Sequence, residues 1–365
     1  MPTIQDITRY LETIAPRAYQ ESYDNAGLIT GDPTAEVRGI LVSLDAVESV
    51  IDEAIAHDCN LVVAHHPIVF RGLKSLTGKN YVERTVIKAI KNDVALYAIH
   101  TNLDNVLPGV NKRICDRLGL QDSRILVPKT GTLQKLVTFV PQENTEPVLR
   151  ALGEAGAGQI GNYRNCSFRT AGTGTFQPNE RANPHIGEAG KREEVEEQRI
   201  EVIYPAHLAG PVLRALRTSH PYEEVAYYQQ ALENENQEVG SGMIGTLPEP
   251  LSGEDFLAYL KEKMQLSVVR HTRLTDRPIQ RVAVCGGAGS FLLPHALRQQ
   301  ADAFVTADYK YHEFFDADGQ LVIADIGHYE SEVFTKHLIA EFLSAKFVNF
   351  AVRLSETNTN PVFYA

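Results

Sequence analysis

The chain has 365 residues, of which 43% are hydrophobic and 22% charged, and its formal net charge is -11. This composition excludes a disordered chain, and the acidic balance excludes a broad electrostatic surface for nucleic acid. No segment has the apolar length of a membrane span and the four cysteines are isolated, so we expect a cytoplasmic protein without a disulfide framework.

The first third of the chain alternates short apolar runs with helical periods. The expected strands lie at residues 37–44, 60–64 and 94–99, and the expected helices at residues 47–57, 81–92 and 109–118. Strands that alternate with helices predict a parallel sheet covered on both faces.

The middle of the chain has a different texture. The expected order is a strand at 135–140, a helix at 145–155, a hairpin-like pattern at 159–175, a strand at 200–204, a helix at 208–219 and a strand at 225–230. This β-α-β-β-α-β order predicts an inserted ferredoxin-like α+β domain over residues 131–239. A long polar stretch at 176–199 ends in the charged run KREEVEEQR, which is typical of a solvated surface.

The strand–helix rhythm returns in the last third. Strands are expected at residues 281–285, 303–306, 321–324 and 347–353, with a long helix at 330–345. We therefore predict an α/β protein in which residues 1–130 and 240–365 form one discontinuous domain, with a parallel-rich sheet flanked by helices. The two halves of this domain must meet to form one site.

Histidines and an acid follow two strands of the first half. His65 and His66 come directly after the apolar run LVVA, and adjacent side chains on extended backbone point to opposite sides. Two neighbouring metal ions, each taking one imidazole, fit this arrangement better than one tetrahedral ion. After the next strand, Asp104 is placed to bridge two cations, and His100 is a ligand, a hydrogen-bond donor to a ligand or a proton shuttle.

Matching residues follow two strands of the second half. His328 and Glu332 are four residues apart, so they share one face if a helix begins near His328. Asp308 and His312 have the same spacing after another strand and are candidate acids, bases or substrate contacts. A single histidine at a strand end is more often structural, but several strand ends that each deliver histidine or carboxylate indicate a site for zinc, manganese or iron(II).

Two further motifs are open to more than one interpretation. The sequence GGAGS at residues 286–290 fits a tight strand-to-helix turn near the site, or an anion at a helix N-terminus, and it does not match the dinucleotide-binding or P-loop patterns. The sequence HPYEEV at residues 220–225 lacks metal-ligand spacing, which favours an edge-strand or interface role.

The segments AHHP, HTNLD and GHYESE together resemble the Ngg-interacting-factor-three-like family, whose members carry the name GTP cyclohydrolase I type 2 homologs. The segments DNAG, CGGAGS and TADYKYHE also resemble it, and the insert resembles the nitrogen-regulator and copper-tolerance folds of the longer members. The resemblance implies a toroidal homohexamer with two divalent metal ions per subunit. It implies as ligands His65, His66, Asp104, His328 and Glu332.

The leading hypothesis is a metal-dependent hydrolase that acts on a small molecule, with GTP ring opening as the reaction that the resemblance implies. In this hypothesis His100, Asp308 or His312 moves protons. One alternative is a metal-dependent phosphoesterase or amidohydrolase with another substrate. The other alternative is a metal-binding regulatory protein without turnover.

Overall fold

The structure is a computed structural model that describes residues 1–365, and its chain divides into two compact units. The first unit joins Met1–Pro128 to Gln237–Ala365, and the second unit is the intervening segment Lys129–Asn236. Both units combine helices with β-sheets, so the predicted α/β class is confirmed. None of the helices combines the length with the apolar character needed to cross a bilayer.

The first unit contains two sheets, where the sequence indicated one. The five-stranded sheet has the order β1 (Gly27–Thr30), β4 (Ala95–Ala98), β3 (Leu61–Ala64), β2 (Ile40–Ser43) and β15 (Val352–Leu354). Only β1 runs antiparallel to its neighbour, and the other four strands are parallel. The three central strands, β2, β3 and β4, are buried along their whole length, as expected for parallel strands with helices on both faces.

The six-stranded sheet has the order β11 (Arg270–His271), β14 (Val322–Asp325), β13 (Ala303–Ala307), β12 (Ile279–Ala288), β10 (Asn236–Leu251) and β5 (Gln121–Lys129). The three strands β12, β13 and β14 are parallel, and β10 and β11 run antiparallel to them. Each half of the chain therefore gives one edge strand, β15 or β5, to the sheet of the other half. This exchange ties the two distant stretches of chain into one unit.

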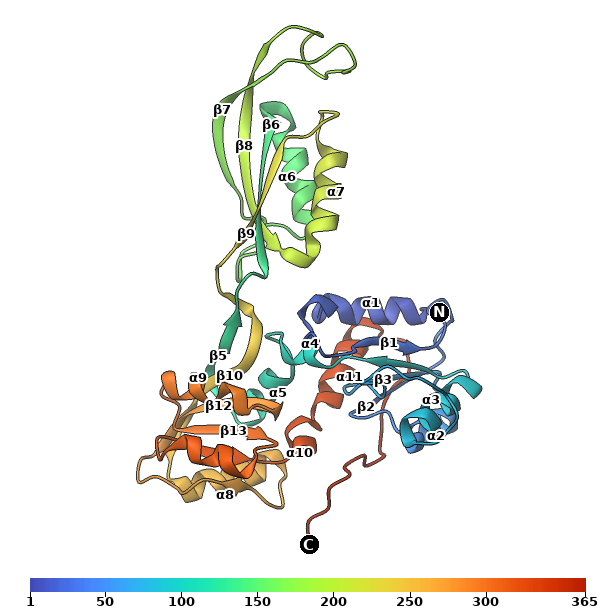
Figure 1. The fold of residues 1–365 in the computed structure, drawn as a ribbon, viewed down its shortest axis with the longest axis vertical. Coiled ribbons are helices and arrows are strands. Elements are labelled where there is room, and N and C mark those ends of the chain that lie inside the picture. The colour runs from blue at the N-terminus through green and yellow to red at the C-terminus, as the bar shows by residue number, and fades with distance from the viewer. The chain divides into compact units, whose positions relative to one another are not determined.

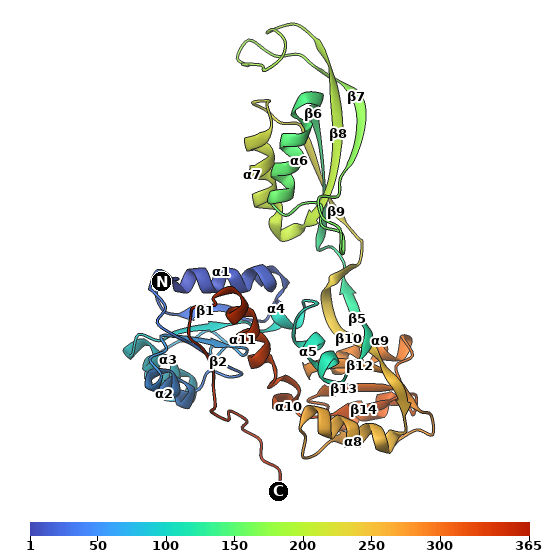
Figure 2. The same cartoon turned by 180° about the vertical axis from the view of Figure 1, so that it is seen from behind.

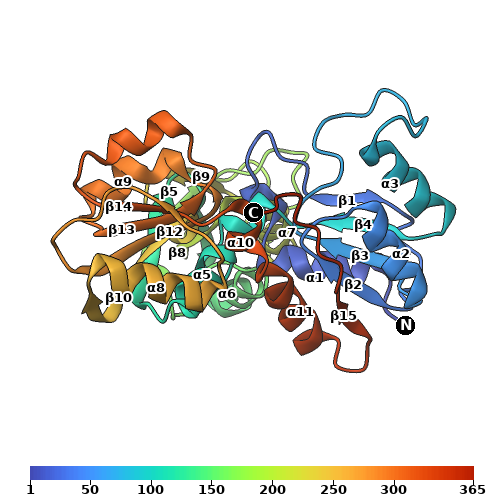
Figure 3. The same ribbon diagram turned by 90° about the horizontal axis from the view of Figure 1, so that it is seen from below.

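A single apolar core joins the two sheets. It contains Val63 and Tyr97 from the first sheet and Val284 and Val305 from the second. The helices that contribute to this core are α1 (Ile4–Ile14), α5 (Val110–Arg117), α8 (Gly253–Met264) and α11 (Thr335–Lys346). Figure 3 shows the two sheets on either side of the short helix α10 (His328–Glu332).

Smaller cores cover the outer faces of the two sheets. The first sheet is covered by α2 (Glu48–Ala56) and α3 (Tyr81–Lys91), and the second by α9 (Leu293–Arg298). Neighbouring residues of β3 divide between the faces, since Val63 enters the central core and Val62 the outer one. This period of two explains why both faces had to be apolar in the sequence.

The inserted unit has the expected β-α-β-β-α-β order. Its elements are β6 (Leu133–Pro141), α6 (Thr145–Glu154), β7 (Phe168–Phe176), β8 (Glu193–Pro205), α7 (Ala209–Ser219) and β9 (Tyr227–Leu232). The sheet is antiparallel with the order β7-β8-β6-β9, and both helices pack on one face of it (Figures 1 and 2). The other face carries no helix of this unit.

Several predicted elements differ in the structure, and the strand expected at 347–353, for example, is reduced to β15. The strand expected to begin at residue 200 is β8, which begins at Glu193, so most of the charged run belongs to this strand. It forms ladders with β7 and β6, and such pairing depends on neighbours that the local sequence does not identify. The long helix expected at 330–345 is divided into α10 and α11.

Candidate metal centre

In the first sheet, the side chains of the site follow the carboxyl ends of parallel strands. The strand β3 ends directly before His65 and His66, and β4 ends two residues before His100. A short helix, α4 (Thr101–Asp104), then places Asp104 one turn further on. Parallel neighbours end at the same edge of a sheet, so these four side chains are brought to one place.

In the second sheet, β14 leads into α10, which begins at His328 and ends at Glu332. The two side chains are one helical turn apart, and the distance from His328 Nε2 to Glu332 Oε2 is 3.0 Å. The neighbouring strand β13 ends directly before Asp308. A helix therefore begins at His328, as the predicted shared face of His328 and Glu332 required.

The two halves of the chain meet at these residues. Three groups of side chains have their ligand atoms within 4.8 Å of one another: His65 with His66 and His100, His66 with His328 and Glu332, and His65 with Asp104 and Glu332. All five predicted ligands belong to this cluster, together with His100. Because His65, His66 and Glu332 each occur in two groups, the groups overlap and form one continuous centre.

All four imidazoles of the cluster are oriented in the same way. Each uses its Nδ1 for a hydrogen bond, and the acceptors are the Ile99 carbonyl for His65 (2.8 Å), Asp45 for His66 (2.7 Å), Asp24 for His100 (2.8 Å) and Asp308 for His328 (2.8 Å). An Nδ1 that donates a proton leaves Nε2 as the atom available to a metal ion. This is the arrangement by which metal proteins fix the tautomer and the direction of histidine ligands.

Two buried atoms at the centre lack a hydrogen-bond partner. These atoms are Nε2 of His65, whose side chain is fully buried, and Oδ1 of Asp104, and they lie 3.6 Å apart. An unpaired buried polar atom costs free energy, so native proteins seldom contain one without a reason. An imidazole nitrogen and a carboxylate oxygen that converge in this way fit a shared divalent cation.

Burial and the charge of Glu332 together determine the protonation of three of these histidines. Burial lowers the pKa of His65 to about 3, so this imidazole is neutral. Burial also acts to lower the pKa of His66. The hydrogen bonds of His66 to Asp45 and Glu332 outweigh this effect and raise the pKa to about 9. For His328, burial is likewise outweighed by Glu332 and Asp308, and the pKa rises to about 11.

The two carboxylates of the cluster behave differently from each other. Burial, and then the charge of Glu332, raise the pKa of Asp104 well above its usual range. Burial also opposes ionisation of Glu332, but His328 and His66 outweigh it and hold its pKa well below the usual range. Glu332 is therefore the anionic centre that the two protonated histidines share.

The three predicted catalytic residues lie in different places. His100 belongs to the cluster, and Asp308 contacts it through Nδ1 of His328. His312 is exposed, and its recorded ring contacts are with Tyr311 and Phe315. The geometry gives Asp308 an orienting contact, while a role for His312 stays a prediction.

Two orienting acids, Asp45 and Asp24, were not among the predicted site residues. Asp45 lies two residues after β2 ends, so its place after an apolar strand was a usable signal. Asp24 lies in a loop, 76 residues before its partner His100, and only its place in the DNAG segment drew attention to it. No local pattern links a carboxylate to a histidine at such a separation.

The glycines of GGAGS allow the chain to pass close to the cluster. A Cβ atom at Gly287, whose φ is +61°, would lie 2.6 Å from Glu332 Oε1. The Gly286 N–H donates to Asn111 and the Gly287 N–H donates to Ser331, so both amides are engaged. These contacts favour the tight turn over the anion site for the first two glycines of the motif.

The last residues of the chain reach the same centre. The Thr359 hydroxyl donates to Oδ2 of Asp45, whose Oδ1 accepts the His66 Nδ1–H. The Asn360 amide donates to Glu330 of α10 at 3.0 Å. The C-terminal segment therefore contacts the acid that orients one predicted ligand and the helix that carries two others.

We expect Thr359→Val to weaken divalent metal binding by about tenfold, because losing an outer hydrogen bond loosens the ligand that it orients. Competition with a chromophoric chelator measures this affinity. Thr359→Ser keeps the hydroxyl and should bind like the wild type. The control is Thr13→Val, since Thr13 is exposed and its hydroxyl donates to the carbonyl of Tyr10. Equal affinities for Thr359→Val and wild type would show that the contact is unimportant.

Fold and site together define an α/β protein whose two-sheet unit is assembled from distant parts of the chain around a cluster of histidines and carboxylates that could hold metal ions. The chain belongs to the family described as Duf34/NIF3 (NGG1p interacting factor 3), whose model matches residues 2–361. The resemblance seen in the sequence motifs is thereby confirmed.

Individual relatives match almost end to end. Proteins named GTP cyclohydrolase 1 type 2 homolog are 40% identical over 364 residues in Bacillus subtilis (strain 168) and 41% identical over 363 residues in Halalkalibacterium halodurans. Each alignment covers 98% of this chain and 97% of the relative. The crystal structure of a Bacillus cereus protein related to NIF3 is 38% identical with a TM-score of 0.88, and the match covers 100% of this chain and 99% of that one.

Proposed function

We propose that this protein is a metal-dependent hydrolase that holds two divalent cations. The proposed ligands are His65, His66, Asp104, His328 and Glu332. One observation carries the proposal: four imidazoles converge with Nδ1 already engaged, beside two acids and two buried atoms that lack partners. Histidine and carboxylate together suit zinc, iron or manganese.

The chain's own residues have separate roles in this proposal. Bound divalent cations would supply Lewis acidity and a water molecule of lowered pKa. His100, whose Nδ1–H is held by Asp24, presents Nε2 to the cluster and is the proposed proton carrier. Asp308 keeps the His328 ring in place and is a positioning residue.

A cavity beside the cluster offers room for a substrate. Its volume is about 650 Å³, and it is lined by His66 and His328, by Asp308 and Arg270, and by residues of the C-terminal segment. This volume lies within the range of small-molecule sites. The Arg270 guanidinium is held by Asp325 at 3.0 Å and remains half-exposed, so it is available to a negatively charged group.

GTP is the first substrate to test, because the relatives carry the name GTP cyclohydrolase 1 type 2 homolog. In the proposed reaction one water adds at C8 and opens the imidazole ring, and a second water releases formate. The full-length protein is loaded separately with zinc, manganese and iron(II), metal content is measured, and formate is assayed after incubation with GTP. Formate released in proportion to GTP consumed is the expected result.

Other outcomes separate the alternatives. Phosphoester or amide cleavage without formate would replace the ring-opening reaction with the phosphoesterase or amidohydrolase function. Full metal occupancy without turnover on any of these substrates would overturn catalysis and favour a metal-binding regulatory protein. The homohexamer implied by the family resemblance stays a prediction, which native mass spectrometry of the purified protein checks.

A further inference from the structure

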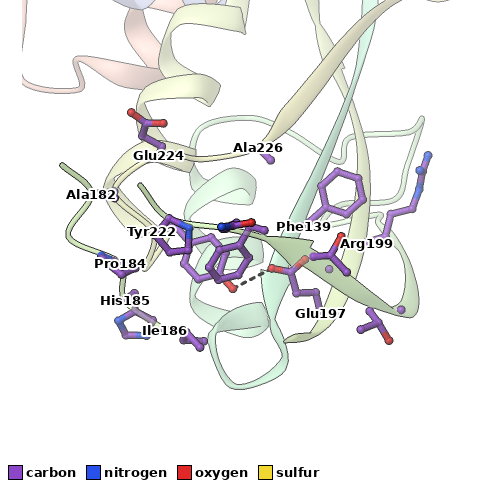
Figure 4. A pocket seen from close by; sticks show the side chains of 18 of the residues that line it. Phe139, Ala182, Pro184, His185, Ile186, Glu197, Arg199, Tyr222, Glu224 and Ala226 are labelled. Atoms are coloured by element: carbon purple, nitrogen blue, oxygen red, sulfur yellow. Dashed lines mark hydrogen bonds between the residues drawn. The ribbon is translucent and has the colours of Figure 1, made fainter. Parts of the chain in front are cut away.

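The inserted unit contains a cavity that is separate from the metal centre. Its volume is about 1040 Å³, and its walls are β7, the connection from β7 to β8 and the segment around Tyr222 (Figure 4). Ile200 and Val202 of β8 pack in the core beneath α6 and α7. Glu197 and Arg199 lie on the opposite face of the strand, so the cavity opens on the side of the sheet that carries no helix.

A buried carboxylate lies in the wall of this cavity. Glu197 is only 8% exposed, and its one hydrogen-bond partner is the Tyr222 hydroxyl, which donates to Oε1 at 2.9 Å. Glu197 forms no salt bridge with a cationic side chain. Arg199, on the same face of the strand, pairs instead with Glu201 at 2.9 Å. Buried acids in proteins are almost always paired with a cation, whereas the hydrogen-bond partner of Glu197 is a neutral phenol.

Aromatic rings line the same cavity as this carboxylate. The Tyr222 ring has the rings of Phe176 and His185 at centroid distances of 5.9 and 6.3 Å. On the other side, Phe139 and Tyr228 form an edge-on pair at 5.6 Å. Aromatic faces attract cations and also provide apolar surface for the body of a ligand.

Two glycines of β7 create the space. A Cβ atom at Gly174 would lie 2.0 Å from Glu197 Oε2, so the carboxylate lies against bare backbone there. Gly172 is directly opposite Glu197 in the β7–β8 ladder, and a Cβ atom at this position would meet nothing within 4 Å. The open space of the cavity therefore begins beside the carboxylate.

We propose that this cavity binds a small organic cation that joins a primary ammonium group to an apolar body. The ammonium pairs with Glu197, and the body lies against Tyr222 and Phe139. The other charged residues of the cavity wall, among them Arg181 and Glu223, are exposed, and solvent screens their contribution. This binding site does not depend on the metal centre or on hydrolysis.

The test uses the full-length protein and three ligands of the same shape. Phenethylammonium carries the ammonium, 2-phenylethanol is neutral, and 3-phenylpropionate is an anion. Binding is followed by isothermal titration calorimetry and by ligand-observed NMR. We expect phenethylammonium to bind at least tenfold more tightly than either of the others, because a charge-assisted contact with a buried acid is made by the cation alone.

Three variants locate the site. Glu197→Gln should reduce the affinity for phenethylammonium by about tenfold, and Gly172→Val should block binding by filling the open space next to the carboxylate. Glu196→Gln removes an exposed charge one residue away and should bind like the wild type. Thermal unfolding and circular dichroism of each variant show whether it is folded. Equal affinity for the three ligands, or unchanged binding in folded Glu197→Gln and Gly172→Val, would overturn the proposal.

Discussion

Glu332→Gln should lose metal binding and, with it, any metal-dependent hydrolysis. Glu332 is 3% exposed, and its Oε2 accepts hydrogen bonds from His66 and His328 at 2.9 and 3.0 Å, while its Oε1 lies 3.9 Å from His65 Nε2. Its carboxylate is thus the one group that faces three of the four imidazoles. Glutamine keeps the shape but removes the negative charge and places an amide where a cation would bind.

We expect the affinity for zinc to fall by at least 100-fold in this variant, and turnover to fall below detection. Metal content after gel filtration against a competing chelator measures the zinc affinity. The formate or phosphoester assay measures the turnover. Glu262→Gln, at an exposed position on α8, is the matched control. Retention of both metal ions by folded Glu332→Gln would remove the basis of the proposed site.

Asp104→Asn should have two opposite effects. Asp104 lies beside Glu332, with their ligand atoms in one group with His65 within 4.8 Å, and its buried Oδ1 has no partner. In the metal-free protein two acids so close repel each other, and asparagine replaces this repulsion with an N–H donor. Removing the same carboxylate takes away a proposed metal ligand.

The metal-free Asp104→Asn variant should therefore be more stable than the metal-free wild type, by roughly 1 kcal/mol or about 2 °C in unfolding temperature. With zinc added, the order should reverse, because a ligand that binds only the folded state stabilises it and the variant binds it weakly. Calorimetric scans of both proteins with and without zinc measure the four temperatures. If zinc raised the unfolding temperature of the variant by as much as that of the wild type, Asp104 would be excluded as a ligand.

Much of the site was predictable because metal ligands at strand ends leave a local pattern. The runs LVVA before His65 and VIAD before His328 are short and apolar, and an acid or imidazole directly after such a strand stands out. The four-residue spacing of His328 and Glu332 also carried information, since the helical turn that it required is present. The local spacing of residues thus singled out the side chains that form the cluster.

Other features depend on contacts that local periodicity does not contain. The charged run before Arg199 becomes strand because β7 and β6 pair with it, although its own composition favours a solvated surface. The orienting acids Asp24 and Asp45 were missed for a similar reason, since each acts on a histidine more than 20 residues away. An alternating pattern of apolar residues indicates that a strand has a buried face. It does not identify the strand that pairs with it.

The sequence by itself determined the α/β class and the kinds of side chain that follow the strands near the site, because residue spacing encodes which faces are buried. Only the tertiary structure decided that the halves form two sheets that exchange edge strands, and that His66 meets Glu332 from 266 positions away. The physical reason is that the pattern of apolar and polar residues is contained in a single segment. A hydrogen bond or a shared cation needs two partners, and packing alone brings them together.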